Sequence, residues 1–366
     1  MKKVLFILNT GMVNAGVPNV IMNIVDNLSN KNLFDILVCD ENDRYYDKQF
    51  ESYGGKIFRT KLLEYENNKI IYPLRGIKLF WEVYKILSKN GKYDIVHCHN
   101  GVESGICLLA AKLANIKVRI SHSHGIYNRK GKNFILAFYR YLCKILVKKF
   151  ANVKLTCSQK SGESLFGASN NILNILNPVD ISKYHDIQKK TNYKINILQI
   201  GYFCNNKNQI FSLNLINKMK EMGLNVNLSL IGFESEYGYL DMMKENIKRM
   251  GIEENVTFLK HDYDKKEIFS ETDVLLLPSY SEACPLVLLE AQAANIKCIA
   301  SDNVPEDVNL GLCKFIKLQD EDKWINTIIN INNIALDINI EKLAKVDKLN
   351  YALNIQKIYD GKTKIS

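Results

Sequence analysis

Two glutamates stand in the segment 278–294, PSYSEACPLVLLEAQAA, at a spacing that would let both meet one ligand. Glu282 lies in a polar turn after the apolar run Asp273–Leu277, and Glu290 lies in a helical pattern that begins at Pro285. Because proline favours the first turn of a helix and a helix rises about 1.5 Å per residue, the carboxylates would be roughly 8–10 Å apart. Carboxylates accept hydrogen bonds from hydroxyls, as they do from ribose. The same spacing also fits a solvated loop residue and an outward-facing helix residue.

The order of strand, turn and helix in this segment predicts a binding site for an anion. The strand Asp273–Leu277 leads into the turn, so the first backbone N–H groups of the helix lie at the carboxyl end of the strand. Those N–H groups have no partner inside the helix and carry the positive end of its dipole. A carboxylate beside a bound phosphate is repelled, so hydroxyl groups are the expected partners of Glu282 and Glu290.

Four histidines occur as two pairs with a spacing of two residues. His97 and His99 lie in YDIVHCHNG, and His122 and His124 lie in VRISHSHG. In a strand this spacing puts both members of a pair on one face. Such a face could hold zinc, although no neighbouring carboxylate or cysteine obviously completes a ligand set. The other interpretation is that the rings finish two strands with hydrogen bonds.

The segment 128–150, NRKGKNFILAFYRYLCKILVKKF, has the pattern of a basic amphipathic helix. One stripe is apolar and consists of Phe134, Phe138, Tyr141, Leu142 and Ile145. Basic residues flank this stripe, namely Arg129, Lys130, Lys132, Arg140, Lys144, Lys148 and Lys149. Such a helix can lie on an anionic membrane surface. It can also pack its stripe on a sheet of its own domain and leave the basic side in water.

Short runs rich in valine, isoleucine and leucine alternate with helical patterns along the chain. The predicted strands are Lys3–Leu8, Asp35–Cys39, Asp94–Cys98, Lys117–His122, Val153–Cys157, Ile172–Leu176, Ile195–Ile200, Asn225–Ile231, Val256–Leu259, Asp273–Leu277 and Lys297–Ala300. The predicted helices include Val17–Leu28, Leu74–Lys89, Glu103–Ala114, Lys207–Met222, Tyr239–Met250 and Pro285–Ala294. Because apolar strands that alternate with helices form parallel sheets covered on both faces, the pattern predicts an α/β fold.

The alternation pauses in the polar stretch Pro178–Tyr193 and restarts with a new strand at Ile195. We therefore predict two doubly wound, Rossmann-like units, with residues 1–178 in the first and 179–348 in the second. The helical segment Ile340–Ile358 could cap the second unit or cross back to the first, and we assign residues 349–366 to the first. Ligands of such sheets bind at the carboxyl ends of the strands, so we expect the site in a cleft between the units.

Composition and charge limit the classes of protein. The chain has 366 residues, of which 47% are hydrophobic and 24% charged, as in packed domains. No apolar run approaches the length of a membrane span, and the N-terminal MKKVLFILNTG lacks a cleavage site and predicts a first strand. The net charge of +10 suits an anionic partner, but the basic residues are scattered, which argues against nucleic acid. Nine cysteines without a C-x-x-C pair predict buried, reduced thiols in a cytosolic protein.

Glu282, seven intervening residues and Glu290 resemble the E-x7-E motif of retaining glycosyltransferases of family 4, which have the GT-B fold. The surrounding SYSEACPLVLLEAQAANIKCIASD is similar to the version in bacterial capsule and exopolysaccharide enzymes. The resemblance implies that Glu290 binds the ribose of a nucleotide sugar and that Glu282 binds hydroxyls of the transferred sugar. It also implies backbone contacts with the sugar and diphosphate along the run Ala283, Cys284, Pro285 (which has no N–H) and Leu286.

A second segment, GYFCNNKN at 201–208, is similar to a family segment whose arginine and lysine hold the donor diphosphate. Lys207 matches the lysine, whereas Tyr202 stands where the arginine is expected. Fixed cations at this place would stabilise the departing nucleotide without a metal ion. Tyr202 offers one hydroxyl donor and no charge. The alternative is that Lys207 merely opens an exposed helix.

Two further segments carry the resemblance. The loop NTGMVNAGVPNV at 9–20 is similar to the family's double-glycine loop, with Ala15 at the first glycine, and implies a donor-binding role for Gly16. A plain strand-to-helix turn is the alternative. His124 best matches the active-site histidine of the family, and His122 is the second choice. An imidazole there could hydrogen-bond the sugar or polarise the acceptor hydroxyl.

The resemblance therefore implies an enzyme that moves a sugar from a UDP- or GDP-sugar to a hydroxyl acceptor with retention of configuration. It implies catalytic roles for His124, Glu282 and Lys207, and no metal ion or cofactor. The acceptor would be a lipid-linked saccharide or a growing surface polysaccharide, and the protein would be cytoplasmic or peripheral on the inner face of the membrane. A weak or inactive homologue acting as a partner subunit stays open because of Tyr202 and Ala15. An oxidoreductase lacks support, since no dinucleotide fingerprint follows the first strand.

Overall fold

The protein consists of two compact units. The computed structural model describes residues 1–62, 72–127, 133–168, 171–184, 186–190, 193–259 and 263–362. The first unit contains residues Met1–Pro178 and Lys348–Ser366, and the second contains Val179–Asp347. The end of the chain thus belongs to the same unit as its beginning.

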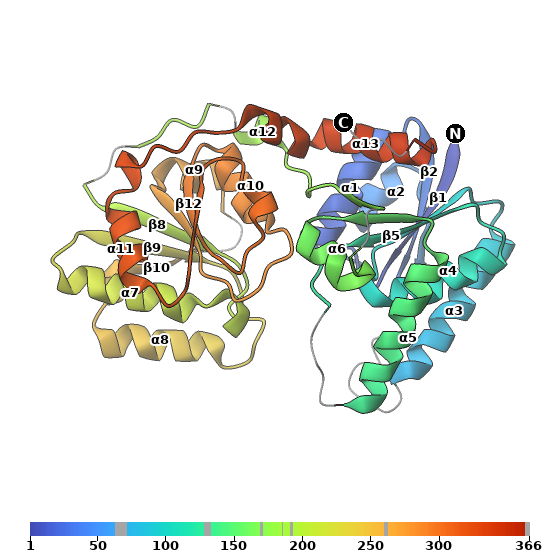
Figure 1. Ribbon diagram of the computed structural model, residues 1–366, viewed down its shortest axis with the longest axis horizontal. Coiled ribbons are helices and arrows are strands. Elements are labelled where there is room, and N and C mark those ends of the chain that lie inside the picture. Colours follow the sequence, from blue (N-terminus) through green and yellow to red (C-terminus); the bar gives the residue numbers. More distant parts are fainter. Residues whose placement is uncertain are drawn as a thin grey trace. The chain divides into compact units, whose positions relative to one another are not determined.

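The first unit contains a parallel sheet with the strand order β3-β2-β1-β4-β5-β6-β7 (Figure 1). Its strands are β1 (Lys2–Leu8), β2 (Asn32–Val38), β3 (Ile57–Arg59), β4 (Ile95–Cys98), β5 (Val118–Ser123), β6 (Val153–Thr156) and β7 (Ile172–Asn174). Strand β3 was not predicted; it is three residues long, half-buried and at the edge of the sheet. The order is that of a Rossmann-like sheet, as predicted.

Helices cover both faces of this sheet because the strands are apolar on both sides. They are α1 (Gly16–Leu28), α2 (Asp47–Ser52), α3 (Tyr72–Lys89), α4 (Ser104–Leu113), α5 (Phe134–Phe150), α6 (Gln159–Phe166) and α13 (Lys348–Tyr359). Phe6 of β1 belongs to the core shared with α1 and α13, whereas the neighbouring Leu5 and Ile7 belong to the core shared with α3 and α4. The alternation follows from the two-residue period of a strand.

The second unit repeats the same architecture with the strand order β10-β9-β8-β11-β12-β13. Its strands are β8 (Ile195–Ile200), β9 (Val226–Ile231), β10 (Val256–Leu259), β11 (Val274–Leu277), β12 (Lys297–Ser301) and β13 (Cys313–Ile316). The sequence analysis missed β13, which includes Lys314 and is only four residues long. Two Rossmann-like sheets in one chain match the predicted fold.

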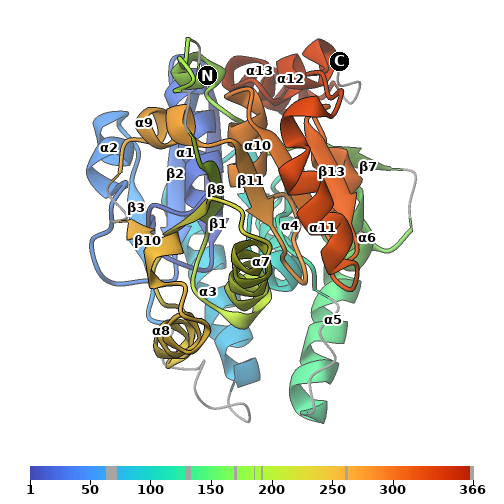
Figure 2. The same ribbon diagram turned by 90° about the vertical axis from the view of Figure 1, so that its left-hand side faces the viewer.

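The helices of the second unit again lie on both faces of the sheet. They are α7 (Gln209–Glu221), α8 (Tyr239–Met250), α9 (Lys265–Glu271), α10 (Leu286–Ala293), α11 (Glu321–Ile329) and α12 (Ile340–Val346). Figure 2 shows α7 between α8 and α11, and apolar side chains of these three helices share one core with the strands. The other face carries α9 and α10 (Figure 1).

The C-terminal helical segment differs from its prediction. The sequence pattern indicates one helical stretch over Ile340–Ile358, but the structure breaks it at Asp347, whose ψ of 136° is extended. The two pieces belong to different units, α12 to the second and α13 to the first. Close to the break, Val179 N–H donates to the carbonyl of Val346 at 2.7 Å, so the two passages between the units run beside each other.

All nine cysteines lie in the described ranges, and none of them forms a disulfide. Eight are buried, as predicted, and Cys204 is half-buried. Burial raises the pKa of the thiols of Cys39 and Cys143 to about 12, so these groups are protonated at neutral pH. Among the described helices, none combines the length and the hydropathy that a bilayer crossing requires.

Candidate active site

The second sheet reverses its strand order between β8 and β11. Strands added after β8 lie on one side of it, and strands from β11 onward lie on the other. The loops that leave these two neighbours at their carboxyl ends therefore diverge, and ligands of doubly wound sheets bind at this point. The segments 201–208 and 278–285, which contain the predicted donor-binding residues, are these two loops.

Backbone and amide hydrogen bonds tie the two loops together. Tyr280 N–H donates to the carbonyl of Asn206 at 2.9 Å, and the Asn206 side chain donates to the carbonyl of Ser281 at 2.9 Å. Asn208, in the left-handed conformation with φ of 55°, donates from its side chain to the carbonyl of Pro278 at 3.2 Å. Asparagine adopts this conformation more readily than most residues. The two loops are thus held together by the side chains of Asn206 and Asn208, for which the motifs predicted no role.

Lys207 and Glu282 meet at the junction of these loops. The Lys207 Nζ lies 2.5 Å from Glu282 Oε1, and their side chains are 18% and 11% exposed. The carbonyl of Lys207 accepts a hydrogen bond from Gln199 Nε2 at 2.8 Å, and Ser212 Oγ donates to Gln199 Oε1 at 2.7 Å. The alternative that Lys207 merely opens an exposed helix is wrong, because its side chain is largely covered and paired.

A close backbone crossing shapes the start of the first loop. A Cβ atom on Gly232 would lie 2.0 Å from the carbonyl oxygen of Gly201, so only glycine fits at this crossing. Gly201 itself has a φ of 157°. Beyond it, Tyr202 is 40% exposed, and its ring packs edge-on against Phe233 with the centroids 4.6 Å apart. Tyr202 therefore lies at the surface of the loop, and its uncharged side chain stands where the family resemblance predicted an arginine.

Helix α10 begins where proline places it. Pro285 is the N-cap with a φ of −70°, and the helix runs from Leu286. The buried Gln292 anchors this helix, because its amide donates to the carbonyl of Val308 and its oxygen accepts from Leu310 N–H at 2.7 Å. Ala283, Cys284 and Pro285 lead into this helix, of which Leu286 is the first residue, and Cys284 and Pro285 are buried. The first N–H groups of the helix, those of Leu286 and Val287, have no acceptor within the helix itself.

Glu290 is held by a lysine from another helix. Lys265, the first residue of α9, contacts both carboxylate oxygens at 2.7 and 2.8 Å. Tyr184 packs nearby, and the pKa of its phenol is raised by its burial and by the Glu290 carboxylate. The side chain of Glu290 is 18% exposed, so it is not the outward-facing helix residue of the alternative interpretation. Both glutamates of the motif are therefore largely covered carboxylates with a lysine partner.

Sequence reasoning missed Lys265, Tyr184 and the paired asparagines. Lys265 is 25 residues from Glu290, and Tyr184 comes from the short 3-10 helix Ile181–Tyr184. No local spacing relates these residues to the motif, since the sheet topology brings them together. Lys265 begins α9 directly after the N-cap Asp264, and no feature of the sequence identifies it as a site residue.

The remaining predicted residues lie in the first unit. Gly16 is the first residue of α1, and its N-cap Ala15 makes no side-chain capping bond, so the loop after β1 leaves backbone donors at this helix start. His124 directly follows β5 and is half-buried, whereas His122 is fully buried within the strand. The accessible ring is therefore that of His124, the first choice of the sequence analysis. The cleft expected between the units stays a prediction.

All four histidines of the two pairs lie together in the first unit. His97 Nε2 lies 3.3 Å from His122 Nδ1, and His99 Nδ1 lies 2.8 Å from His124 Nε2. Burial lowers the pKa of His97, His99 and His122 well below its ordinary value, and the neighbouring rings lower it further. These three rings are neutral at physiological pH. The ligand atoms of the same three rings lie within 4.8 Å of one another, which keeps the zinc interpretation open by distance alone.

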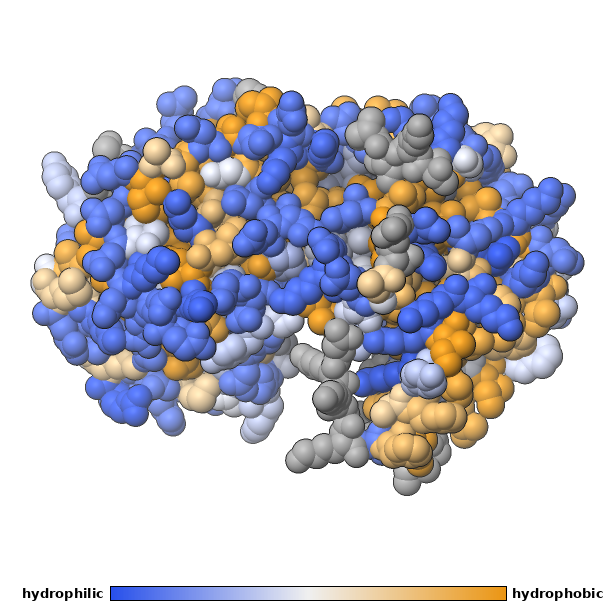
Figure 3. All heavy atoms as spheres, in the orientation of Figure 1, coloured by the Kyte–Doolittle hydropathy of each residue, from blue (hydrophilic) through white to orange (hydrophobic). Residues whose placement is uncertain are grey.

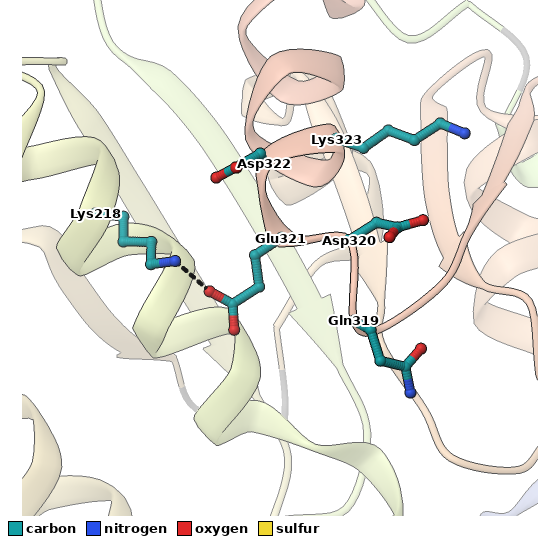
Figure 4. A pocket seen from close by; sticks show the side chains of 6 residues that line it. All are labelled: Lys218, Gln319, Asp320, Glu321, Asp322 and Lys323. Atoms are coloured by element: carbon teal, nitrogen blue, oxygen red, sulfur yellow. Dashed lines mark ion pairs between the residues drawn. The ribbon is translucent and has the colours of Figure 1, made fainter.

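A hollow elsewhere on the second unit contains none of the predicted residues. Figure 4 shows it beside the first turn of α11, with Lys218 of α7 paired to Glu321 at 2.5 Å. Its other lining residues are Gln319, Asp320, Asp322 and Lys323. Three carboxylates dominate this lining, which makes it unsuited to a diphosphate.

Comparison with known families identifies the class of protein. The family described as Glycosyltransferase Family 4 matches residues 15–183, and the family described as Glycosyl transferases group 1 matches residues 180–308. A solved structure of Anabaena HepE in complex with UDP-glucose superposes with a TM-score of 0.74 at 17% identity and covers 99% of this chain and 100% of its own. The fold is thus the GT-B fold of two Rossmann-like units.

Curated relatives agree with this class. EpsF of Bacillus subtilis (strain 168), named as a glycosyltransferase, is 28% identical over 326 residues, which cover 85% of this chain and 82% of EpsF. The capsular polysaccharide biosynthesis glycosyltransferase CapH of Staphylococcus aureus is 26% identical and covers 71% of this chain and 70% of CapH. An Escherichia coli UDP-Gal:alpha-D-GlcNAc-diphosphoundecaprenol alpha-1,3-galactosyltransferase is 25% identical and covers 94% of this chain and 92% of itself.

The protein therefore belongs to the group 1 glycosyltransferases of family 4, a retaining family of enzymes with the GT-B fold. It is a nucleotide-sugar glycosyltransferase related to enzymes of surface-polysaccharide biosynthesis. The family predicted from the E-x7-E motif is confirmed, and the oxidoreductase alternative is excluded. The roles of the individual site residues stay predictions.

The neutral histidines predict that the protein loses stability in mild acid. In the unfolded chain these rings titrate near about 6.5, whereas in the folded protein they stay neutral well below that pH. Below about pH 6.5 the unfolded state thus binds more protons, and each such ring costs up to about 1.4 kcal/mol of stability per pH unit. Urea unfolding followed by circular dichroism should give a free energy of unfolding that falls between pH 7.5 and 5.5.

His122→Asn is the matched variant for this measurement, since it removes one buried ring. Its loss of stability between pH 7.5 and 5.5 should be smaller than that of the wild type by about 1.4 kcal/mol in total, whatever its absolute stability. Equal losses for the two proteins, or a wild type that is as stable at pH 5.5 as at 7.5, would contradict the neutral cluster.

Proposed function

We propose that this enzyme transfers a sugar from a UDP- or GDP-sugar to a hydroxyl of a lipid-linked saccharide, with retention of configuration, during surface-polysaccharide assembly. The observation that carries the proposal is the pair of lysine-bound carboxylates, Lys207–Glu282 and Lys265–Glu290, at the carboxyl edge of the second sheet. The first turn of α10 adds backbone donors beside them. This combination of cations, backbone N–H groups and carboxylates suits a diphosphate that has hydroxyl groups on both sides.

In this proposal, donor binding rearranges the Lys207–Glu282 pair. The diphosphate attracts the Lys207 ammonium more strongly than one carboxylate does, because it carries two negative charges. Lys207 then faces the diphosphate, and Glu282 becomes available to accept hydrogen bonds from hydroxyls of the transferred sugar. Lys207 stabilises the charge that develops on the leaving nucleotide, which is the role a metal ion would otherwise have.

Glu290 has a different role in the proposal, because Lys265 holds it from the side of α9. A bidentate pair fixes the orientation of a carboxylate while leaving acceptor capacity on both oxygens. Glu290 accepts hydrogen bonds from the two ribose hydroxyls of the nucleotide. His124 and the loop before Gly16 serve the acceptor and donor from the first unit, and the donor phosphate itself takes the proton of the acceptor hydroxyl. The enzyme needs no metal ion in this scheme.

The lipid-linked acceptor rests on a relative and on a surface of the first unit. The E. coli relative is named for a diphosphoundecaprenol-linked acceptor and a UDP-Gal donor. On this chain, α5 exposes the predicted apolar stripe: Phe134 is 82% exposed and Tyr141 61%, and Phe138, Leu142 and Ile145 are also exposed. The alternative that this stripe packs on the sheet is wrong.

Helix α5 packs through a different face. Tyr139, Cys143 and Val147 are its buried residues, and the Tyr139 hydroxyl donates to the buried Glu103 at 2.9 Å. A Cβ atom on Gly105 of α4 would lie 2.3 Å from the carbonyl oxygen of Cys143, so the two helices are in close contact. The rigid packing of this face leaves the opposite, apolar face without a protein partner among the described residues.

Exposed apolar residues of α3 extend the stripe into one patch, which we name the α3–α5 patch. Its α3 members are Leu74, Ile77 and Trp81, and its α5 members are Phe134, Phe138, Tyr141, Leu142 and Ile145. Hydrophobic side chains gather where α3 and α5 lie (Figure 3). In its described part, α5 carries the basic residues Arg140, Lys144, Lys148 and Lys149 and no acidic one; Arg129, Lys130 and Lys132 lie outside the described residues. This chemistry fits an anionic lipid surface.

The donor proposal predicts that Glu290→Gln weakens donor binding by about 10- to 100-fold, because the neutral amide keeps one acceptor oxygen for the ribose hydroxyls and loses the second one and the charge. Calorimetric titration with UDP- and GDP-sugars, in buffer containing EDTA, measures this loss and the metal independence together. Glu267→Gln, a change at an exposed glutamate of α9, is the control and should bind as the wild type does. Unchanged affinity of Glu290→Gln at an unchanged melting temperature would remove the ribose role.

The missing arginine generates a second prediction. Tyr202→Arg should tighten donor binding by about tenfold, because it adds a charged donor where the family places one. The same titration measures the effect, and Tyr202→Phe serves as the control for loss of the hydroxyl. Affinity unchanged in Tyr202→Arg would mean that another group already neutralises the diphosphate. A wild type that binds no nucleotide sugar at all would instead favour the partner-subunit alternative.

The α3–α5 patch predicts binding to vesicles of phosphatidylglycerol but not of phosphatidylcholine, measured by co-sedimentation. Lys148→Gln with Lys149→Gln should reduce binding by roughly tenfold or more, at about 1 kcal/mol per basic residue, and salt should reduce it further. Phe138→Ser should also weaken it, whereas Met222→Ser, at an exposed apolar residue of the second unit, should not. Equal binding to both lipids, or none to either, would contradict the membrane role.

A further inference from the structure

The four histidines of the first unit occupy one face of two neighbouring strands at the carboxyl edge of the sheet. Strand β4 pairs with β5 in a register that sets His97 opposite Ile120, so a step of two residues along each strand keeps all four rings on this face. The ring centroids of His97 and His99 are 4.4 Å apart, and those of His122 and His124 are 4.0 Å apart. The rings therefore touch and restrict one another.

One hydrogen bond links the accessible ring to a buried one. His99 Nδ1 lies 2.8 Å from His124 Nε2, and the two rings are stacked at 5.0 Å with an angle of 15°. His99 is 4% exposed and neutral, so it holds one ring proton. Either His99 donates this proton to His124, or His99 accepts the proton that His124 carries on Nε2. In both arrangements Nε2 of His124 is occupied.

The other ring nitrogen of His124 has no polar partner within the described chain. Nδ1 of His124 is buried and unpaired, as are Nε2 of His99 and Nε2 of His122. Burial without a hydrogen bond costs free energy, which a ligand hydroxyl would recover. Of these three atoms, only Nδ1 belongs to a ring that is partly exposed at the end of β5. It is thus the one nitrogen of this half-buried ring that keeps its hydrogen-bonding capacity for a ligand.

We infer that His99 is a positioning residue: it fixes the ring of His124 through the Nδ1–Nε2 hydrogen bond, so that His124 meets the sugar or the acceptor hydroxyl through Nδ1. The inference rests on the proposed role of His124 and specifies the contacting atom and its support. If the ring of His124 turned over, it would break the bond to His99 and present Nε2 instead. The bond therefore decides which nitrogen faces the substrate.

A second layer of contacts supports this pair from the last helix of the chain. The hydroxyl of Tyr359 in α13 lies 2.9 Å from His97 Nδ1, and His97 Nε2 in turn lies 3.3 Å from His122 Nδ1. Tyr359 is 1% exposed, and the His122 ring lies against that of His124 with the centroids 4.0 Å apart and an angle of 34° between the planes. The C-terminal helix thus supports the His99–His124 pair indirectly, through His97 and His122.

A metal ion is the competing explanation for this cluster, and the contacts do not favour it. Both ring nitrogens of His97 already have hydrogen-bond partners, so only two of the three close rings have an unpaired ring nitrogen. No carboxylate belongs to this group of ligand atoms in the described chain, so the charge of a buried dication would be uncompensated. Hydrogen bonding explains the arrangement with the atoms present.

Two variants of His99 distinguish its hydrogen bond to His124 from the space that its ring fills. His99→Phe keeps a ring but removes both nitrogens, whereas His99→Asn keeps an amide at the position of Nδ1. We expect His99→Phe to lower kcat by about 10- to 100-fold with little change in the KM for the donor, and His99→Asn to recover most of this loss. Equal activity of wild type and His99→Phe, with both folded by circular dichroism, would overturn the inference.

Nuclear magnetic resonance tests the hydrogen bond without any sugar transfer. In protein labelled with ¹⁵N-histidine, the ring signals of His124, assigned by their loss in His124→Asn, should show a single fixed tautomer in the wild type and in His99→Asn. His99→Phe should give averaged signals of both tautomers. A mixture already in the wild type would overturn the inference even if the donor proposal holds, and a fixed tautomer would support it even if no donor is found.

A titration with Zn²⁺ alone completes the test. The inference predicts no stoichiometric binding by the wild type, as measured by calorimetry and by metal analysis after dialysis. One tightly held zinc per chain that is lost in His99→Phe would overturn the hydrogen-bonded arrangement in favour of a metal site.

Discussion

A diphosphate and two carboxylates repel one another, and the proposed donor site has to hold both at one edge of a sheet. The ion pairs Lys207–Glu282 and Lys265–Glu290 reduce this repulsion, because each largely covered carboxylate has its own ammonium group. Without these lysines the glutamates would lose water without gaining a charge partner. The hydrogen-bonded loops, the glycine crossing at 201 and 232 and the proline-initiated α10 all serve to hold these two pairs in place.

The fold was predictable from the sequence because the strands are short apolar runs separated by helical patterns. Strands β3 and β13 were not predicted, because both are too short to form a clear apolar run and each includes a basic residue. The break at Asp347 was hidden, because a helical period continues across a point where the chain changes units. The motif glutamates could be found from their spacing. Lys265, the partner of Glu290, could not, because a contact between two helices produces no periodic pattern in the sequence.

The helix α5 shows how far periodicity can decide between interpretations. It has two apolar faces, one with Tyr139, Cys143 and Val147 and one with the exposed stripe, and each repeats every three or four residues. The close approach of α4 at Gly105 and the Tyr139–Glu103 hydrogen bond identify the face that packs. The histidine pairs posed a similar problem: their spacing placed each pair on one strand face, while the register of β4 with β5 combined both pairs into a single layer.

A crystal structure of the protein with a UDP- or GDP-sugar that cannot react tests the central claim most directly. The account predicts that Lys207 Nζ leaves Glu282 and lies about 3 Å from a diphosphate oxygen, while Glu290 keeps Lys265 and accepts hydrogen bonds from the ribose hydroxyls. A donor bound elsewhere, with both lysine–glutamate pairs unchanged, would contradict it.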